Sequence, residues 1–540
     1  MIDLILYNGN IHTLSDAHGT VQALAIAGDR IVAVGDNLSV LELAGPKTIK
    51  HSLQGLTVIP GLTDAHVHWE WTARGMHSVD VETSTKEEAL QRVAEYAAEH
   101  QADEWITGRG WAQDFWPDRE FPTATDLDSV VADRPVFLQA KSGHAAWVNS
   151  AALKLAGISA SMPDPEGGQI IRDQEGNPTG ILLENAIGLV ADLVPSVSPE
   201  RLAEMMVIAQ ERAHRAGLTG LHDFDDPSCL RALQIMRERG QLGLRIVKQI
   251  NKDFLSAALG SGLHSGFGDD WLRIGNLKLF SDGALGPRTA LMTEPYENEP
   301  DNYGISVLDK ETMVELASQA SRAGLATTIH AIGDKAVHDV LDAFEIVRQE
   351  EMAAGIRPSE RRHRIEHVQI IHPDDKHRLA ELNIIASMQP IHATSDWKVA
   401  DRWWGKRSEW AYNPRLQLDQ HVHIAFGSDS PIEPIEPILG IHAAVTRQDK
   451  ENQPDGGWYP DARLTVDETL RGFTKGPAYA AGMEDRLGQL THGYYADLVV
   501  LDKDPYTVEP QALRDLQVLG TMVGGTWRYS ELDNMKRRTS

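Results

Sequence analysis

Two histidines separated by one residue, His66 and His68, follow the apolar run 56–62. In an extended chain, residues i and i+2 point to the same side, so both imidazoles can face one point just past the end of a strand. Two neutral imidazoles that face one point suit a divalent transition metal. The pair alone is weak evidence, because histidine is also common in protein cores and on surfaces.

Further ionisable residues lie inside or at the ends of other apolar runs. Lys278 lies within one run, and His330, His367 and Asp429 each close another. An ionisable side chain in an apolar strand is costly unless it has a purpose. Each has a plain structural explanation by itself, such as a satisfied core histidine, a buried ion pair or a turn cap. Together with the histidine pair, they favour a shared metal site.

Such a site requires a scaffold that gathers distant segments. Eight apolar runs alternate with amphipathic helical segments, such as 199–216 and 311–323. This alternation predicts an α/β fold, a (β/α)8 TIM barrel, whose catalytic groups lie at the carboxyl ends of the strands. The expected strands are 58–66, 218–224, 244–250, 276–280, 326–330, 363–368, 384–389 and 423–429. His222 and Asp223, which close the second strand, are expected to support the site.

Both ends of the chain consist of short apolar runs separated by turn residues. We expect residues 1–57 and 482–540 to form one small β-sandwich domain. The barrel then comprises residues 58–69 and 199–481. The interval 70–198 is expected to be an α/β insertion after the first barrel strand.

The insertion leaves the barrel at the end where active sites of this fold form. We therefore expect it to cover the site. It contains its own helix, which is expected to start at Ser84, with Glu87 completing a capping box.

Composition excludes some partners. The chain has 540 residues and a formal net charge of −27, which argues against binding to nucleic acid or to anionic membranes. No apolar run approaches the length of a membrane span, and no secretory signal is evident at the N-terminus. One cysteine, Cys229, excludes an intrachain disulfide and fits a reducing cytoplasm.

The segment 60–68, followed in order by Lys278, His330, His367 and Asp429, resembles the amidohydrolase superfamily. Within it, the chain is similar to the amidohydrolase family 3 branch, which includes N-substituted formamide deformylases. The resemblance covers nearly the whole chain. Its branch motifs are GHAAWVNSAAL at 143–153, KLFSDGALGPRTA at 278–290 and HAIGD at 330–334.

The resemblance implies a centre with one or two divalent metal ions, most simply Zn²⁺. The histidine pair and Asp429 are expected to hold the more buried ion, and His330 and His367 the second. Lys278 is expected to lose its proton easily and to add carbon dioxide, giving an N6-carboxylated lysine that bridges the ions. A single-ion arrangement stays open, as do manganese, iron and cobalt. The expected metal ligands are His66, His68, Lys278, His330, His367 and Asp429.

The implied mechanism is attack of a metal-bound hydroxide on an amide carbonyl, since a metal lowers the pKa of water to about 7. Asp429 is expected to take the proton and pass it to the leaving amine. His144 is expected to bind the carbonyl or the oxyanion; a structural histidine is an equal alternative, and Ser142 departs from the acidic residue expected nearby. The expected catalytic residues are Asp429, Lys278 and His144.

Substrate contacts are expected from three further residues. Arg288 either meets an anionic or carbonyl group of the substrate or fixes its own loop. Trp111 and Trp147 either favour an apolar substituent or simply pack.

The expected activity is hydrolysis of non-peptide carbon–nitrogen bonds in linear amides, either N-substituted formamides or N-acyl amines. A deaminase or cyclic-amide hydrolase on the same barrel is the alternative, and it would not need Lys278. A non-catalytic scaffold is disfavoured because no expected ligand is missing. The expected partner is a small-molecule amide, and a homodimer stays open.

Overall fold

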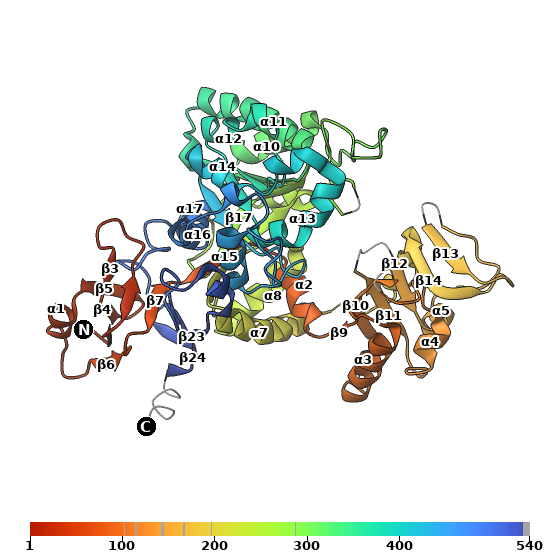
Figure 1. Cartoon of the computed structure of the whole chain (residues 1–540), viewed down its shortest axis with the longest axis horizontal. Coiled ribbons are helices and arrows are strands. Elements are labelled where there is room, and N and C mark those ends of the chain that lie inside the picture. The colour runs from red at the N-terminus through yellow and green to blue at the C-terminus, as the bar shows by residue number, and fades with distance from the viewer. Residues whose placement is uncertain are drawn as a thin grey trace. The chain divides into compact units, whose positions relative to one another are not determined.

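The computed structural model describes the chain except residues 102, 114–115, 142–144, 166–167, 196, 287 and 533–540. The chain divides into two compact units (Figure 1). Met1–Glu70 and Met206–Ser540 form one unit, and Trp71–Met205 form the other. None of the described helices combines the length and the apolar character that a membrane crossing requires.

Eight parallel strands form one sheet in chain order, with the first and last strands meeting. Val67 pairs with Ser430 in a parallel bridge, and the amide of Asp429 donates to the carbonyl of His66 at 2.8 Å. The prediction of a (β/α)8 barrel is confirmed. The strands are β8 (Leu62–Val67), β15 (Leu218–Asp223), β16 (Arg245–Asn251), β17 (Leu272–Phe280), β18 (Thr327–Ala331), β19 (Arg364–His367), β20 (Ile385–Met388) and β21 (Ile424–Phe426).

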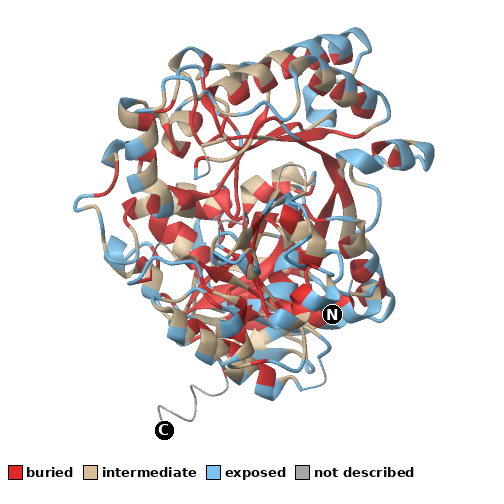
Figure 2. Cartoon of the chain, turned by 90° about the vertical axis from the view of Figure 1, so that its right-hand side faces the viewer, coloured by how far each residue is buried: buried red, intermediate tan, exposed pale blue. Residues whose placement is uncertain are grey.

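Several of the helices that alternate with these strands bury one side and expose the other, as the red and blue faces in Figure 2 show. In α10 (Lys310–Arg322) the buried side includes Met313, Ala317 and Ala320, the spacing of one helical face. The other helices are α7 (Pro199–Arg215), α8 (Pro227–Glu238), α9 (Leu255–Gly260), α11 (Asp334–Ala353), α12 (Arg378–Glu381), α13 (Pro390–Trp404), α14 (Pro414–Asp419), α15 (Pro437–Thr446), α16 (Val466–Gly472) and α17 (Lys475–Ala480).

The first predicted strand, 58–66, is in fact two strands separated at Gly61. β7 (Thr57–Pro60) belongs to a terminal sheet, and only β8 belongs to the barrel. A Cβ atom at Gly61 would lie 2.4 Å from Oγ1 of Thr219, so the close approach of β15 requires glycine here. The single-strand prediction was wrong because apolar character continues across this break.

Two sheets built from the chain ends share one core, which confirms the predicted β-sandwich. Its core includes Leu6, Ile26, Val58, Leu498 and Met522. The six-stranded sheet has the order β24-β23-β22-β7-β2-β3, and the four-stranded sheet β5-β4-β1-β6. The strands are β1 (Leu4–Tyr7), β2 (Asn10–His12), β3 (Thr20–Val21), β4 (Ala23–Ala27), β5 (Arg30–Gly35), β6 (Ile49–Ser52), β7, β22 (Leu498–Leu501), β23 (Val518–Val523) and β24 (Thr526–Ser530).

The second unit, orange to yellow in Figure 1, has a six-stranded mixed sheet of its own. Its first long helix, α3 (Lys86–Glu99), begins after Thr85, whose side chain accepts from the amide of Glu88. The expected start at Ser84 with Glu87 was therefore one residue early. The strands are β9 (Val79–Asp80), β10 (Ile106–Trp111), β11 (Val136–Ala140), β12 (Ala145–Val148), β13 (Gly168–Arg172) and β14 (Pro178–Glu184).

Candidate metal centre

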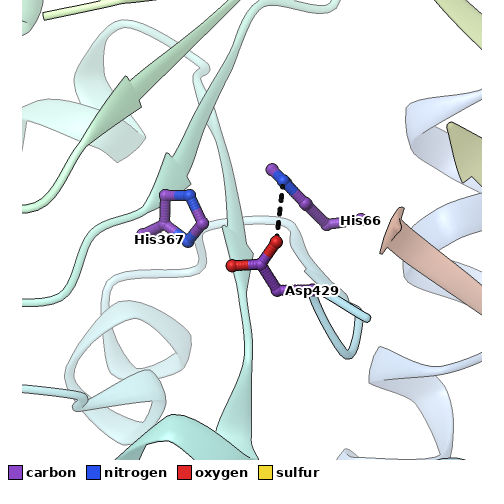
Figure 3. Close-up of side chains that lie close together, drawn as sticks. All are labelled: His66, His367 and Asp429. Carbon is purple, nitrogen blue, oxygen red and sulfur yellow. Dashed lines mark ion pairs between the residues drawn. The ribbon is translucent and has the colours of Figure 1, made fainter. Parts of the chain in front are cut away.

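Three buried residues from different strands meet at the carboxyl end of the barrel. His66 lies near the end of β8, His367 ends β19, and Asp429 follows β21. Their potential ligand atoms all lie within 4.8 Å of one another. Figure 3 shows the two imidazoles on either side of the carboxylate, and Nε2 of His66 is 3.6 Å from Oδ1 of Asp429.

The histidine pair presents its two Nε2 atoms to one carboxylate oxygen. Nε2 of His68 lies 3.5 Å from Oδ1 of Asp429, the oxygen that also faces His66. The Nδ1 atoms point to other carboxylates: His66 to Oε2 of Glu366 at 2.6 Å, and His68 to Oδ1 of Asp225 at 2.9 Å. A proton on each Nδ1 leaves each Nε2 with a lone pair, the form that binds metal.

The other two histidines lie beside this group. The ring centroids of His330 and His367 are 4.7 Å apart, and those of His66 and His367 are 4.9 Å apart. Nδ1 of His367 lies 2.8 Å from Oε1 of Gln389, and Nε2 of His330 lies 3.0 Å from the carbonyl oxygen of Gly283. The nitrogens left for a metal are Nε2 of His367 and Nδ1 of His330.

Lys278 is a buried residue of β17, with its ammonium group 4.7 Å from the ring centroid of Phe224 and 4.5 Å from that of Phe280. Burial lowers the pKa of Lys278 to about 8, although the charges of Glu366 and Asp429 oppose the shift. The ring of Phe224 stacks on that of His66, with 3.9 Å between centroids, and the ring centroid of Phe280 lies 5.2 Å from that of His330, so the amine lies close to the centre.

Burial keeps most of these imidazoles neutral. It lowers the pKa of His66 to about 4, that of His330 to about 3, and that of His367 well below its usual value. For His68 burial also acts to lower the pKa, but Asp225 and Asp429 outweigh it and the pKa is raised. Neutral His66 then directs a lone pair at a carboxylate oxygen, an arrangement that favours a cation between them. The donor set therefore fits a divalent metal.

His392, in α13, is a site residue that the sequence analysis missed. Its Nε2 lies 3.3 Å from Oδ2 of Asp429, and its Nδ1 lies 3.5 Å from Oε1 of Glu433. Burial acts to lower the pKa of His392, but the hydrogen bonds to these carboxylates raise it to about 10. Burial acts to raise the pKa of Asp429, but His392 and the nearby imidazoles hold it well below its usual value. The signal for His392 was its position just after a barrel strand.

Backbone geometry also holds the centre in place. His367 and Asp429 have φ angles of 75° and 63°, unusual for residues with side chains. The carboxylate of Asp64 accepts hydrogen bonds at 3.0 Å from the amides of His66 and Ser428, which ties the first strand to the end of the last. Burial raises the pKa of Asp64 to about 7.

The expected supporting residues, His222 and Asp223, contact the partners of the histidine pair. Oδ2 of Asp223 accepts from the amide of Asp225 at 3.3 Å, and Arg364, which contacts His222, pairs with Glu366. Oδ2 of Asp223 lies 3.0 Å from the ammonium of Lys248, and Nδ1 of His222 contacts Arg364. Asp223, Asp225 and Cys229 also lie close enough together to hold a metal ion, but the ammonium of Lys248 already supplies a positive charge beside Asp223.

Arg288 is tied to its own part of the chain. Its Nε lies 2.9 Å from Oε1 of Glu299, and its guanidinium lies 4.6 Å from the ring centroid of Trp403. These contacts match the interpretation that Arg288 fixes its loop, and a contact with substrate stays a prediction.

Trp111 and Trp147 are fully buried within the insertion. Their indole N–H groups donate to the carbonyls of Leu138 and Thr123, at 2.8 and 2.7 Å. The structure thus gives both a packing role, and their role in substrate binding stays a prediction. His144 lies outside the described residues, and its catalytic role likewise stays a prediction.

Comparisons with known proteins agree with this architecture. A family model described as "Amidohydrolase family" matches residues 52–529. The chain is 31% identical over 554 residues to an N-substituted formamide deformylase from Arthrobacter pascens, covering 98% of each chain. It is 33% identical over 550 residues to the protein LONG AFTER FAR-RED 3 from Arabidopsis thaliana, covering 98% of this chain and 91% of that one. A solved structure of an uncharacterized metal-dependent hydrolase from Pyrococcus furiosus is 31% identical, with a TM-score of 0.77, and the match covers 93% of this chain and all of that one.

Proposed function

Because the chain belongs to the amidohydrolase family and is therefore a hydrolase, we propose that it hydrolyses linear amides with the help of divalent metal ions. The proposed substrates are N-substituted formamides or N-acyl amines. The observation that carries the proposal is the convergence of His66, His367 and Asp429 on one buried point. The deformylase relative, at 31% identity, supports this substrate class.

The proposed metal is zinc, which imidazole and carboxylate ligands suit. His66, His68 and Asp429 would hold one ion, and His330 and His367 a second. A bound zinc ion supplies Lewis-acid chemistry, which acidifies water and polarises a carbonyl group.

Lys278 is proposed to be N6-carboxylated. With its pKa lowered to about 8, a useful fraction of the amine is neutral near neutral pH. The neutral nitrogen forms a C–N bond to carbon dioxide and releases one proton, leaving a carbamate with two oxygens. Carboxylation therefore places a negative charge beside four histidines, where protonated Lys278 would place a positive one. Lys278→Ala is therefore expected to lower zinc stoichiometry, and millimolar formate or acetate is expected to restore part of the activity.

Asp429 can serve both as ligand and as base because its two oxygens face different groups. Oδ1 faces the histidine pair, and Oδ2 faces His392. The pKa of Asp429 is held well below its usual value, so the group is ionised at neutral pH. It can take a proton from the attacking water and deliver it to the leaving nitrogen. His392 fixes the orientation of the carboxylate.

A partly exposed aromatic side chain beside the centre supports a bulky apolar substituent on the substrate. Phe280 ends β17 with 43% of its surface exposed, and its ring centroid lies 5.2 Å from that of His330. An aromatic or alkyl group of the amine would cover this ring.

The alternative is a deaminase or cyclic-amide hydrolase with one ion. It is favoured by the compact group of His66, His367 and Asp429, which by itself suits a single ion. A single zinc per chain, with activity that survives Lys278→Ala, would support this alternative.

The proposed function is tested by metal analysis of the purified protein and a screen of N-substituted formamides and N-acyl amines. We expect release of the amine, loss of activity after chelation and recovery with zinc. Full activity in thoroughly chelated protein would overturn the proposal.

A further inference from the structure

The four histidines differ in what holds their second nitrogen. His66 and His68 donate to carboxylates, Glu366 at 2.6 Å and Asp225 at 2.9 Å. Both carboxylates are almost fully buried, with side chains 0% and 1% exposed, so water screens them little. Arg364 pairs with Glu366 at 2.8 Å and keeps it ionised, so that it acts only as an acceptor.

The remaining two histidines donate to neutral groups. His367 donates to the amide oxygen of Gln389 at 2.8 Å, and His330 donates to the backbone carbonyl of Gly283 at 3.0 Å. The carboxylate of Asp282 lies farther from the same nitrogen of His330, at 3.5 Å. Asp282 also accepts three backbone N–H groups, those of Leu291, Ile332 and Gly333.

We propose that these partners give the two halves of the centre unequal affinities: the carboxylate-supported pair, His66 and His68, holds one ion tightly, and the neutral-supported pair, His330 and His367, holds an exchangeable ion. The inference rests on the proposed metal dependence. A carboxylate that accepts from an imidazole N–H raises the basicity of the opposite nitrogen, and such partners change metal affinity about 10–100-fold. Asp429 adds to the inequality, because its Oδ1 lies 3.6 Å from Nε2 of His66 and 3.5 Å from Nε2 of His68.

Gln389 is therefore a positioning residue that sets the affinity of the weaker half. Its Oε1 accepts from His367, and its Nε2 is buried without a hydrogen-bond partner among the described residues. Gln389→Glu would exchange a neutral acceptor for a carboxylate without breaking a described hydrogen bond. The change would give His367 the kind of partner that His66 and His68 already have.

Gln369 offers a matched control. It lines the same small cavity, of about 10 Å³, as Gln389 and His367. Its Oε1 accepts from the hydroxyl of Tyr412 at 3.2 Å and from no histidine among the hydrogen bonds of the described residues. Gln369→Glu adds the same charge to the same cavity without changing the partner of a metal ligand.

The test is zinc binding to the full-length apoprotein, measured without substrate by competition with a chromophoric chelator. For the native chain we expect two ions whose dissociation constants differ at least tenfold. Gln389→Glu is expected to tighten only the weaker ion, by about 10–100-fold, and Gln369→Glu to leave both constants unchanged. Asp225→Asn is expected to weaken only the tighter ion. Circular dichroism of each variant checks that the fold is retained.

Failure of this inference differs from failure of the proposed function. If two ions bind with equal affinity, if only one ion binds, or if Gln389→Glu and Gln369→Glu have the same effect, the inference is overturned while metal dependence stands. If no zinc binds to the folded native chain, both the inference and the proposed function are overturned.

Discussion

Replacement of Asp429 by asparagine tests how the centre works. One carboxylate oxygen lies 3.6 Å from His66 and 3.5 Å from His68, and the other lies 3.3 Å from His392. Asparagine has nearly the same shape, but it offers one acceptor oxygen and an NH₂ group that only donates. Because the pKa of His392 is raised to about 10, its ring donates at neutral pH. The amide oxygen should therefore turn to His392, and the NH₂ group should face the metal side.

The variant thus loses both a base and an anionic ligand. Loss of a general base costs about 10²–10⁴-fold in rate, which corresponds to about 3–5 kcal/mol of activation free energy. The assay is kcat for an N-substituted formamide at saturating zinc, with the zinc content of the same sample measured in parallel. Because zinc is saturating, a remaining decrease in kcat reports the loss of the base and not a loss of bound metal.

We expect kcat to fall at least about 100-fold even when the metal content is restored. The midpoint of thermal unfolding serves as the control for folding. A zinc-loaded Asp429→Asn enzyme with a kcat within about fivefold of the native value would refute the assignment of Asp429 as the base.

Three further predictions follow from single residues. Phe280→Ala is expected to raise KM for N-benzyl amides about tenfold, because about 1.4 kcal/mol of apolar contact is lost. KM for N-methyl amides should stay unchanged. Equal effects on both substrates would contradict the proposed contact. Burial lowers the pKa of His214 and of His442 from 6.5 to about 4. Between pH 4 and pH 6.5 the unfolded chain therefore binds more protons than the folded chain. The unfolding free energy should fall as the pH drops from 6.5 to 4, by up to about 3 kcal/mol per histidine. Urea titrations that show no decrease across this range would contradict the prediction. Burial raises the pKa of Cys229 well above its usual value, so iodoacetamide should modify it only in unfolded protein and Cys229→Ser should stay active; rapid labelling of native protein would argue against this.

The barrel could be predicted because local patterns encode it. Most of the barrel strands contain apolar residues in succession, and several carry an ionisable residue at the end, such as His330 or His367. The break at Gly61 could not be predicted, because it depends on the approach of Thr219, which lies far away in the sequence.

The supporting residues were harder to predict than the proposed ligands. Sequence reasoning pointed to Asp223, but Asp225 contacts His68 and Asp223 pairs with Lys248. The contact between His392 and Asp429 joins α13 to the residue that follows β21. The position of His392 just after a barrel strand marks it as a candidate site residue, but its partner depends on distances in the folded chain, which no spacing in a single sequence gives.

The most direct measurement is anomalous diffraction at the zinc edge from crystals of the zinc-loaded protein. The account predicts a peak about 2.0–2.2 Å from Nε2 of His66, Nε2 of His68 and an oxygen of Asp429. Zinc peaks only elsewhere, for example at the partly exposed group of His338, Asp339 and Asp342, would contradict it.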